Sequence, residues 1–253
     1  MIQGGLILKG CKKTYSSTSP IITIITVVYN CNNFLEETIE SVINQTYQNL
    51  EYIIIDGGST DGTIDIIRKY ENYTDYWVSE NDKGIYDAMN KGIGIATGEW
   101  INFMNAGDKF SDNNGLKNII ADKLHLTYDI IYSDTIIKNN SKSLVIYADF
   151  TKQKFIHQSI LYKRNLHIKY GLYLVDKYIT ISDYIFFSQL TSEKNVKYCD
   201  CISVYSVGGV SDSPKSFYQK ICYDYISGKI NRIYFGIIII FYPVYKIMKK
   251  LIW

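Results

Sequence analysis

The sequence has little of what stabilises small secreted proteins. Its five cysteines are scattered and include no CxxC pair, so the sequence favours neither a disulfide framework nor a zinc site. The N-terminal stretch GGLILKGCKK lacks the uninterrupted apolar core of a signal peptide. We therefore expect a protein that is not exported and that works in a reducing cytoplasm.

The chain also lacks a strong excess of charge of either sign. A formal net charge of +2 over 253 residues gives no general signal for polyanion binding, so we expect no nucleic-acid partner. Residues 215–253 are an exception, with seven Lys or Arg and one acid. Hydrophobic residues make up 47% of the chain, which is enough for one substantial core or at most two small ones.

No apolar run is long enough to cross a bilayer as a helix. The longest uncharged stretch near the C-terminus, residues 233–245, is interrupted by Gly236 and Pro243, whereas a membrane span needs about 20 apolar residues. Basic residues flank it on both sides: Lys229, Arg232, Lys246, Lys249 and Lys250. We predict a peripheral membrane anchor over residues 213–253, and the alternative is a helix that packs back on the main domain.

What the sequence does contain is a regular alternation of strand and helix patterns. The β-branched run IITIITVVYN precedes NNFLEETIESVINQ, whose apolar residues recur at helical spacing. The same order repeats in EYIIID with GTIDIIRKY and in YWVS with GIYDAMNKGIGIA, and WINFM then leads into NAGD. This alternation predicts an α/β fold with a mostly parallel, doubly wound sheet flanked by helices.

The pattern loosens after about residue 125. Short candidate strands occur at YDIIYSD, SLVIYA and HQSILYK, and a helix is expected at about 183–191. We divide the chain into an N-terminal extension (1–20), a main domain (21–212) and the basic, apolar C-terminal segment (213–253). Within the main domain, residues 21–110 are the expected nucleotide-binding half, and residues 111–212 are expected to complete a cleft.

Polar side chains follow the expected strands where each one ends: Asn30, Asp56, Asp82, Asn105 and Asp108. The carboxyl ends of parallel strands meet at one edge of a sheet, where ligands bind in open α/β folds. Carboxylates there, together with glycines that let the backbone approach a ligand, suit a nucleotide diphosphate and a divalent ion. The alternative for each position taken singly is an ordinary turn or helix cap.

Between about residues 21 and 211 the sequence resembles the family 2 glycosyltransferases of the GT-A fold. The motifs TIITVVYN, IIIDGGSTDGT, SENDKGIYDAMNKGIGIATGEWINFMNAGD, HQSILYKR and ISDYIFFSQL occur in that family's order and at similar spacings. The block at 79–108 most resembles the branch that assembles bacterial surface polysaccharides such as capsule and O-antigen. The resemblance implies an enzyme that transfers a sugar from a UDP- or dTDP-sugar donor, with inversion, to a glycan or polyprenyl-linked acceptor.

The resemblance also implies which residues bind the nucleotide. Asp56 matches the carboxylate that accepts the N3–H of a uracil-type base, and Tyr29 and Asn30 border the same base. Asp82 and Lys83 match the segment that lines the ribose and diphosphate, where a lysine opposes the negative charge of the leaving group. The alternative for Lys83 is an ordinary solvated lysine.

The NAGD motif corresponds to the acidic DxD-type motif that holds a divalent cation, Mn²⁺ or Mg²⁺, against the diphosphate. The resemblance makes Asp108 the metal ligand and leaves Asn105 to contact the ribose or a metal-bound water. This sequence departs from the acidic pattern at Asn105 and Gly107. Weak metal affinity without nucleotide is therefore expected.

Asp183 matches the family's catalytic base, which takes the proton from the acceptor hydroxyl. From the residues alone, a helix N-cap formed by Asp183 or Ser182 is the simpler interpretation. His157 and Gln158 match a segment that borders the acceptor sugar, although a lone histidine is more often structural.

Two other functions compete with this interpretation. A Rossmann-type dehydrogenase is rejected, because GIGIATG has the wrong glycine spacing and ends a helix instead of following a strand. A non-catalytic, membrane-associated nucleotide-sugar-binding protein that kept the fold remains the alternative. The favoured interpretation places a glycosyltransferase on the cytoplasmic face of the inner membrane, where a lipid-linked acceptor is presented.

Overall fold

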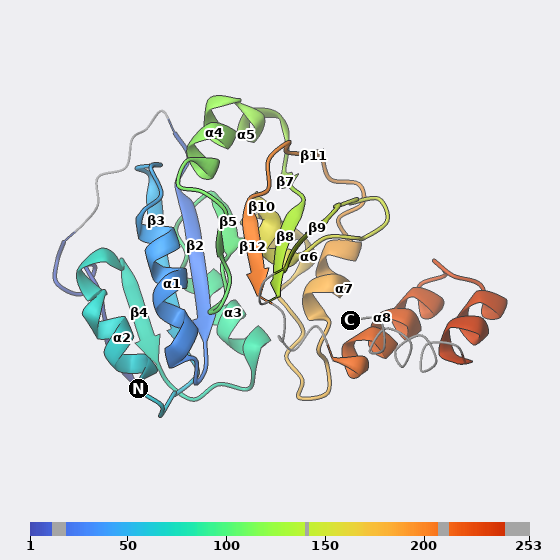
Figure 1. Cartoon of the computed structure of the whole chain (residues 1–253), viewed down its shortest axis with the longest axis horizontal. Coiled ribbons are helices and arrows are strands. Elements are labelled where there is room, and N and C mark those ends of the chain that lie inside the picture. Colours follow the sequence, from blue (N-terminus) through green and yellow to red (C-terminus); the bar gives the residue numbers. More distant parts are fainter. Residues whose placement is uncertain (12–18, 140–141, 207–212, 241–253) are drawn as a thin grey trace.

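A computed structural model of the chain describes residues 1–11, 19–139, 142–206 and 213–240. Its centre is an eight-stranded sheet in the order β1-β4-β3-β2-β5-β10-β7-β11 (Figure 1). Four neighbouring strands of this sheet are parallel: β4 (Tyr76–Ser79), β3 (Leu50–Asp56), β2 (Ile22–Val28) and β5 (Trp100–Phe103). The predicted parallel, helix-flanked sheet is thus present, and its four parallel strands agree with the predicted ranges.

The order in which strands are added to the sheet changes direction at β2. From β2 the chain builds outward through β3 to β4, and it then returns to place β5 on the other side of β2. Such a switch point leaves a crevice at the carboxyl ends of the adjacent strands, where open α/β sheets bind their ligands. A ligand site is therefore expected at the loops after β2, β3, β4 and β5.

The remaining strands of the large sheet come mostly from the second half of the chain. Strand β10 (Ile160–Lys163) runs antiparallel to β5 and to β7 (Ile130–Tyr132), and β11 (Asn195–Lys197) lies parallel to β7. The two halves, 21–110 and 111–212, therefore share one continuous sheet. At the other edge β1 (Ile2–Gly4) pairs with β4, so the N-terminal extension contributes a strand.

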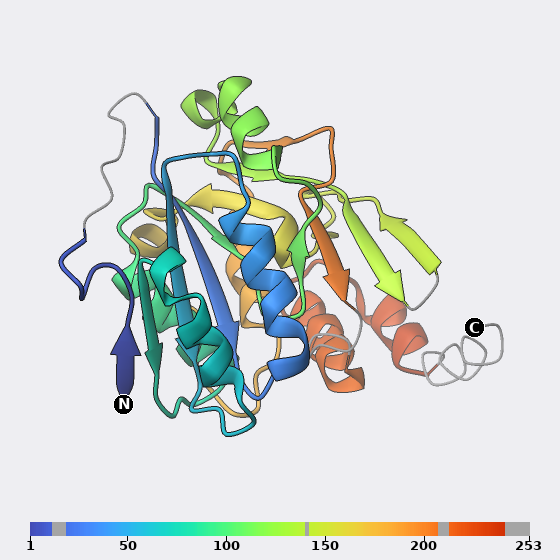
Figure 2. The ribbon, with the colours of Figure 1, turned by 60° about the vertical axis from the view of Figure 1, so that its left-hand side comes forward.

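A second, four-stranded sheet was not predicted from the sequence. It has the order β6-β12-β8-β9 and projects beside the main sheet (Figure 2). Its strands are β6 (Lys109–Phe110), β12 (Ser203–Ser206), β8 (Thr135–Asn139) and β9 (Lys142–Ile146). Because β6 follows directly after NAGD, this sheet holds that motif in place.

Helices cover both faces of the parallel strands. Helix α3 (Ile85–Ile95) packs on one face, where Met89 and Ile93 meet Ile25 and Ile53. Helices α1 (Asn32–Ile43) and α2 (Thr63–Lys69) cover the other face, whose buried residues include Ile24 and Ile54. Strands buried on both faces read as the continuous apolar runs seen in the sequence.

One glycine sets the distance between α3 and the sheet. A Cβ atom at Gly92 would lie 2.6 Å from Cγ2 of Ile25 on β2. The close approach of helix to strand therefore requires a residue without a side chain at this position. Any larger residue here must push α3 outward, together with the loop that precedes it.

The helices after residue 110 are short apart from α8 (Pro214–Ile226). They are α4 (Gly115–Ala121), α5 (Leu124–Thr127), α6 (Leu166–Tyr170) and α7 (Ser182–Ser188), with the 3₁₀ turn η2 (His157–Ser159). The 3₁₀ turn η1 (Glu71–Tyr73) lies earlier, between α2 and β4. A further helical stretch covers residues 232–240. In Figure 1 α8 and this stretch lie at the end of the molecule farthest from α2.

Candidate active site

The polar residues predicted at strand ends do gather at the carboxyl edge of the parallel sheet. Asn30 follows β2, Asp56 ends β3, Asp82 lies just after β4, and Asn105 and Asp108 follow β5. The register of the parallel strands places Val28 opposite Asp56, and Asp56 opposite Ser79. Together with the switch point, this alignment defines one candidate site.

Asp56 is placed differently from its expected position at the rim. Its side chain is wholly buried, and its carboxylate accepts hydrogen bonds from the backbone N–H groups of Gly58 and Ser59 and from the hydroxyls of Ser59 and Ser79. In this structure Asp56 therefore anchors the loop after β3.

Gly57, the residue after Asp56, lies between two of the predicted nucleotide-binding residues. A Cβ atom on Gly57 would come within 2.6 Å of Oδ2 of Asp82 and 3.3 Å of the ring of Tyr29. Tyr29 is mostly exposed, whereas Asp82 is half-buried. The structure thus brings two of the predicted nucleotide-binding residues, Tyr29 and Asp82, against the same buried glycine.

Burial raises the pKa of Asp82 above its ordinary value, although the hydrogen bond that its carboxylate accepts from the backbone N–H of Gly84 acts in the opposite direction. Lys83 is exposed, and its backbone N–H donates to Asp87 at 3.0 Å. Both residues lie in the turn that leads into α3. Both are therefore accessible to a ligand at the edge of the sheet.

Asn30 joins the loops that follow β2 and β3. Its backbone N–H donates to Oγ of Ser59 at 2.7 Å, and its side-chain oxygen accepts the N–H of Thr60 at 2.9 Å. Its φ of 46° is in the left-handed region, which asparagine tolerates better than most residues. Asn30 therefore shapes the wall of the site, with its side-chain oxygen already bound by protein.

The NAGD turn places Asp108 inside the protein. Asp108 is 5% exposed, and its two carboxylate oxygens accept hydrogen bonds from the Gln158 side chain, at 2.5 Å, and from the backbone N–H of Ser206, at 3.0 Å. Gln158, predicted to border the acceptor, thus contacts the predicted metal ligand. Ser206 belongs to β12, so the second sheet fixes this carboxylate.

The oxygen donors in this turn suit a hard cation that is shared with a phosphate ligand. Asn105 has a buried side-chain oxygen without a hydrogen-bond partner among the described residues, in the same turn as the carboxylate of Asp108. The described part of the chain holds no cluster of three or more His, Cys, Asp or Glu that could bind a metal. The residues therefore fit a cation whose shell is completed by diphosphate and water, and not one held by protein alone.

Asp183 lies in the first turn of α7, where the helix dipole favours an acid. Its Oδ1 accepts the hydroxyl of Tyr86 at 2.6 Å, and its Oδ2 lies 3.7 Å from Nδ1 of His157. The N-cap of α7 is Ile181 and makes no side-chain cap hydrogen bond, so neither Asp183 nor Ser182 is the cap. Its side chain remains 26% exposed, in contrast to the buried Asp56 and Asp108.

The 3₁₀ turn η2 links the two carboxylates that the sequence assigned to chemistry. His157 faces Asp183, while its neighbour Gln158 donates to Asp108. His157 is itself buried against the ring of Phe103 at the end of β5, with 5.0 Å between ring centroids. The predicted metal side and the predicted base side are therefore held by adjacent residues of one turn.

Sequence reasoning missed several residues of this site. Tyr86 was not singled out among the residues of α3, and Gly57 carries no side chain to suggest a role. Ser206 of β12, which contacts Asp108, and Tyr173 of the loop between α6 and α7, which contacts His157, also had no local signal. The common reason is that each acts through a contact distant along the chain.

A parallel α/β sheet with carboxylates, glycines and polar loops at its carboxyl edge has the arrangement in which open α/β proteins bind their ligands. The chain belongs to glycosyl transferase family 2, whose model matches residues 23–196. The match covers the parallel strands, NAGD, η2 and α7. This result confirms the resemblance drawn from the motifs.

Curated relatives carry the same family designation. A PGL/p-HBAD biosynthesis glycosyltransferase of Mycobacterium tuberculosis is 31% identical over 176 residues, which are 66% of this chain and 68% of that protein. The glycosyltransferase GlyG of Streptococcus pneumoniae is 35% identical over 98 residues, covering 38% of this chain and 33% of that one. These similarities support a glycosyltransferase.

Solved structures share the fold. Residues 1–349 of S. aureus TarS in complex with UDP superpose with a TM-score of 0.65 at 18% identity, covering 79% of this chain and 63% of that one. The mannosyltransferase PcManGT of Pyrobaculum calidifontis, in complex with GDP-Man and Mn²⁺, gives a TM-score of 0.59 at 20% identity, covering 83% and 64%. This chain thus spans somewhat less than two thirds of these structures and has the GT-A fold, as predicted.

Proposed function

We propose that this protein is an inverting glycosyltransferase that moves a sugar from a UDP- or dTDP-sugar to a glycan or polyprenyl-linked acceptor in bacterial surface polysaccharide synthesis. The observation that carries the proposal is the placement of Asp183. Its carboxylate is partly exposed and is oriented by Tyr86 from a separate element. An accessible, oriented carboxylate beside a nucleotide-binding edge has the properties of a general base.

In the proposed reaction the acceptor hydroxyl attacks the anomeric carbon of the donor sugar from the face opposite the nucleotide. Asp183 takes the hydroxyl proton as the new carbon–oxygen bond forms. The bond from the anomeric carbon to the diphosphate oxygen breaks, and the nucleoside diphosphate leaves with that electron pair. Attack from the opposite face inverts the configuration at the anomeric carbon.

The nucleotide is proposed to lie along the edge formed by Tyr29, Gly57 and Asp82, with Lys83 near the diphosphate. The wall of this edge is stabilised by Asp56 and Asn30. Support comes from structural neighbours of the same fold that were solved with UDP, UDP-GlcNAc and GDP-Man. Contacts along this edge would select between a uracil and a thymine base.

Asp108 and Asn105 are the residues that would hold a divalent cation, Mn²⁺ or Mg²⁺. When bound, such an ion neutralises charge on the leaving diphosphate. A cation at Asp108 must share the carboxylate with Gln158 and Ser206 or displace them. We therefore expect metal to bind tightly only together with the nucleotide.

The segment after α8 is proposed to hold the protein on the cytoplasmic face of the inner membrane. Ile233, Ile237 and Ile240 follow one another at helical spacing over 232–240 and are 76%, 49% and 68% exposed. Within the described ranges no helix is long and apolar enough to cross a bilayer. Residues 241–253, which contain three of the flanking lysines, lie outside the described residues.

Helix α8 connects this segment to the candidate base. The hydroxyl of Tyr184, the residue after Asp183, donates to Asp224 of α8 at 2.8 Å, and Ser188 and Tyr223 join the two helices at 2.8 Å. A membrane contact through the C-terminal segment would therefore place α7 near the surface that presents a lipid-linked acceptor.

Two experiments test the proposal. A panel of UDP- and dTDP-sugars, screened for slow hydrolysis with Mn²⁺, should reveal one donor that is turned over. UDP binding by calorimetry without any hydrolysis would favour the non-catalytic alternative.

Flotation with anionic liposomes should recover the full chain but not a chain that ends at Ser227. The full-length double variant Ile233→Ser, Ile237→Ser is the matched control and should float poorly; equal recovery of all three would exclude the anchor.

A further inference from the structure

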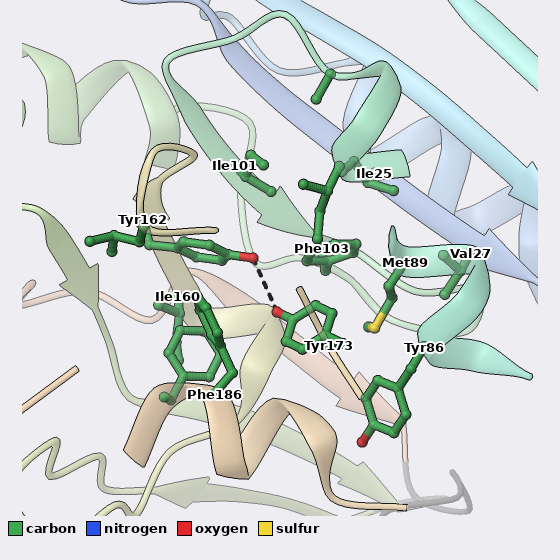
Figure 3. Close-up of a cluster of buried hydrophobic side chains, with 14 of the residues drawn as sticks. Ile25, Val27, Tyr86, Met89, Ile101, Phe103, Ile160, Tyr162, Tyr173 and Phe186 are labelled. Atoms are coloured by element: carbon green, nitrogen blue, oxygen red, sulfur yellow. Dashed lines mark hydrogen bonds between the residues drawn. The ribbon is translucent and has the colours of Figure 1, made fainter. Parts of the chain in front are cut away.

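Behind the candidate base, a chain of polar contacts runs through the aromatic core. His157 Nε2 lies 3.3 Å from the hydroxyl of Tyr173, which lies 3.1 Å from the hydroxyl of Tyr162. Tyr162 in turn lies 2.9 Å from Nε2 of His167. All four side chains are buried, and Figure 3 shows the Tyr162–Tyr173 hydrogen bond between the strands and α7. Asp183 lies at the other side of His157.

The hydrogen bond of His167 at the far end fixes which group donates and which accepts along this series of contacts. Nδ1 of His167 lies 3.0 Å from the carbonyl oxygen of Gly171. A carbonyl only accepts hydrogen bonds, so Nδ1 of His167 must carry a proton. Burial lowers the pKa of His167 to about 4, so the ring is neutral near pH 7 and its Nε2 is an acceptor.

Each hydroxyl donates one proton, so the remaining directions follow in sequence. Tyr162 donates to Nε2 of His167, Tyr173 donates to Tyr162, and Nε2–H of His157 donates to Tyr173. Burial raises the pKa of both tyrosines, which keeps them protonated. Burial likewise lowers the pKa of His157, more than the nearby Asp183 carboxylate raises it. His157 is therefore neutral, with its proton on Nε2.

The consequence appears at the reacting carboxylate. With the proton on Nε2, His157 presents an unprotonated Nδ1 to Oδ2 of Asp183. Two lone pairs that face each other repel, and the separation of 3.7 Å is longer than a hydrogen bond. The other oxygen, Oδ1, already accepts the hydroxyl of Tyr86. A proton that arrives on Oδ2 therefore has an acceptor waiting in His157.

We propose that His157 is a positioning residue for the base: its Nδ1 accepts a hydrogen bond from Asp183 once the carboxyl group has taken the acceptor's proton. This inference rests on the proposed function of Asp183. It assigns His157 a different role from contact with the acceptor sugar. The Tyr173–Tyr162–His167 chain serves to fix the His157 tautomer.

The tautomer can be measured without any substrate. In the folded protein labelled with ¹⁵N in its histidines, the ring nitrogen shifts of His157 should show a bare Nδ1 and a protonated Nε2 near pH 7. A protonated Nδ1 would overturn the inference, and it would do so without touching the proposed glycosyltransferase activity. The titratable groups that face this ring are Asp183 and Tyr173, with His167 one ring further away.

Kinetics with the best donor from the sugar panel, and water as acceptor, provide the second test. His157→Gln keeps a donor near the Nε2 position but loses the acceptor beside Asp183, so kcat should fall roughly 10- to 100-fold with little change in KM. His157→Asn places an amide oxygen near the Nδ1 position and should recover much of the rate. If His157 were merely structural, both variants would lower the stability of the protein, and His157→Asn would be no faster than His157→Gln.

The direction in which the acid limb of the rate–pH profile moves distinguishes a His157 that accepts a hydrogen bond from Asp183 from one that donates to it. Removal of the bare Nδ1 relieves repulsion of the carboxylate, so the limb should move to lower pH in His157→Gln. Tyr162→Phe should move it the same way, because Tyr173 then loses its acceptor and is free to donate to His157 Nε2. A limb that moves to higher pH in His157→Gln would show that His157 donates to Asp183, contrary to the inference.

Discussion

The buried carboxylate of Asp56 anchors the loop after β3, so replacing it with an amide should destabilise the folded protein. In Asp56→Asn one carboxylate oxygen becomes an NH₂ group, and the amide fits best with its oxygen toward Gly58, Ser59 N–H and Ser79. Those three bonds then lose their charge, at about 1 kcal/mol each, and the fourth bond must be rearranged. We expect the free energy of unfolding to fall by about 3 kcal/mol in urea titrations followed by tryptophan fluorescence.

The matched control is Asp65→Asn, an exposed acid in the first turn of α2. Its loss should cost no more than about 1 kcal/mol, through the helix dipole alone. Calorimetry with UDP completes the test, since a loop anchor affects binding through the folded state. If Asp56→Asn were as stable as the wild type and yet failed to bind UDP, the carboxylate would face the base as the resemblance implies, and the anchoring role would be wrong.

Three further outcomes follow from the same geometry. Asp108→Asn should nearly abolish sugar transfer and weaken UDP binding in Mn²⁺, with a smaller effect for Asn105→Ala; wild-type activity in excess EDTA would contradict this. The pKa of His167 falls from 6.5 to about 4 on folding. The contribution of the neutral ring to the free energy of unfolding is therefore fully present above pH 6.5 and is lost as pH falls towards 4, by about 3 kcal/mol in all. His167→Asn should flatten that part of the stability–pH curve measured by urea unfolding, and an unchanged slope would refute it. Because burial raises the pKa of Asp82, its stabilising contribution is present at low pH and lost as pH rises, so Asp82→Asn should raise the Tm near pH 7 while weakening UDP binding; a lowered Tm would contradict the burial argument.

The parallel half of the fold could be predicted because its signals are local. Strands β2 and β3 are continuous apolar runs, and the helices after them have clear periodicity, so the positions of Asp82 and Asp108 at one sheet edge followed directly. The second sheet could not be predicted, because β6 and β12 are short and pair across a long stretch of chain. Its register depends on tertiary contacts that no periodicity encodes.

The site was predicted in its membership more than in its geometry. Motifs located Asp108 and Asp183, but they could not show that Gln158 and His157 of one turn contact them. They also placed Asp56 at the surface, although two glycines after it let the chain fold back over its carboxylate. Side-chain partners distant in sequence decide such details, so they need the structure.

The central claim is that Asp183 is the base of a sugar transfer and not a residue that holds the fold or the donor. The most direct test compares Asp183→Asn with the exposed control Asp176→Asn, by UDP calorimetry and by turnover of the best donor from the sugar panel. A base acts only as the acceptor oxygen attacks, so Asp183→Asn should bind UDP as the wild type does while kcat falls at least about 100-fold. Turnover at the wild-type rate, or loss of UDP binding with kcat unchanged, would contradict the account.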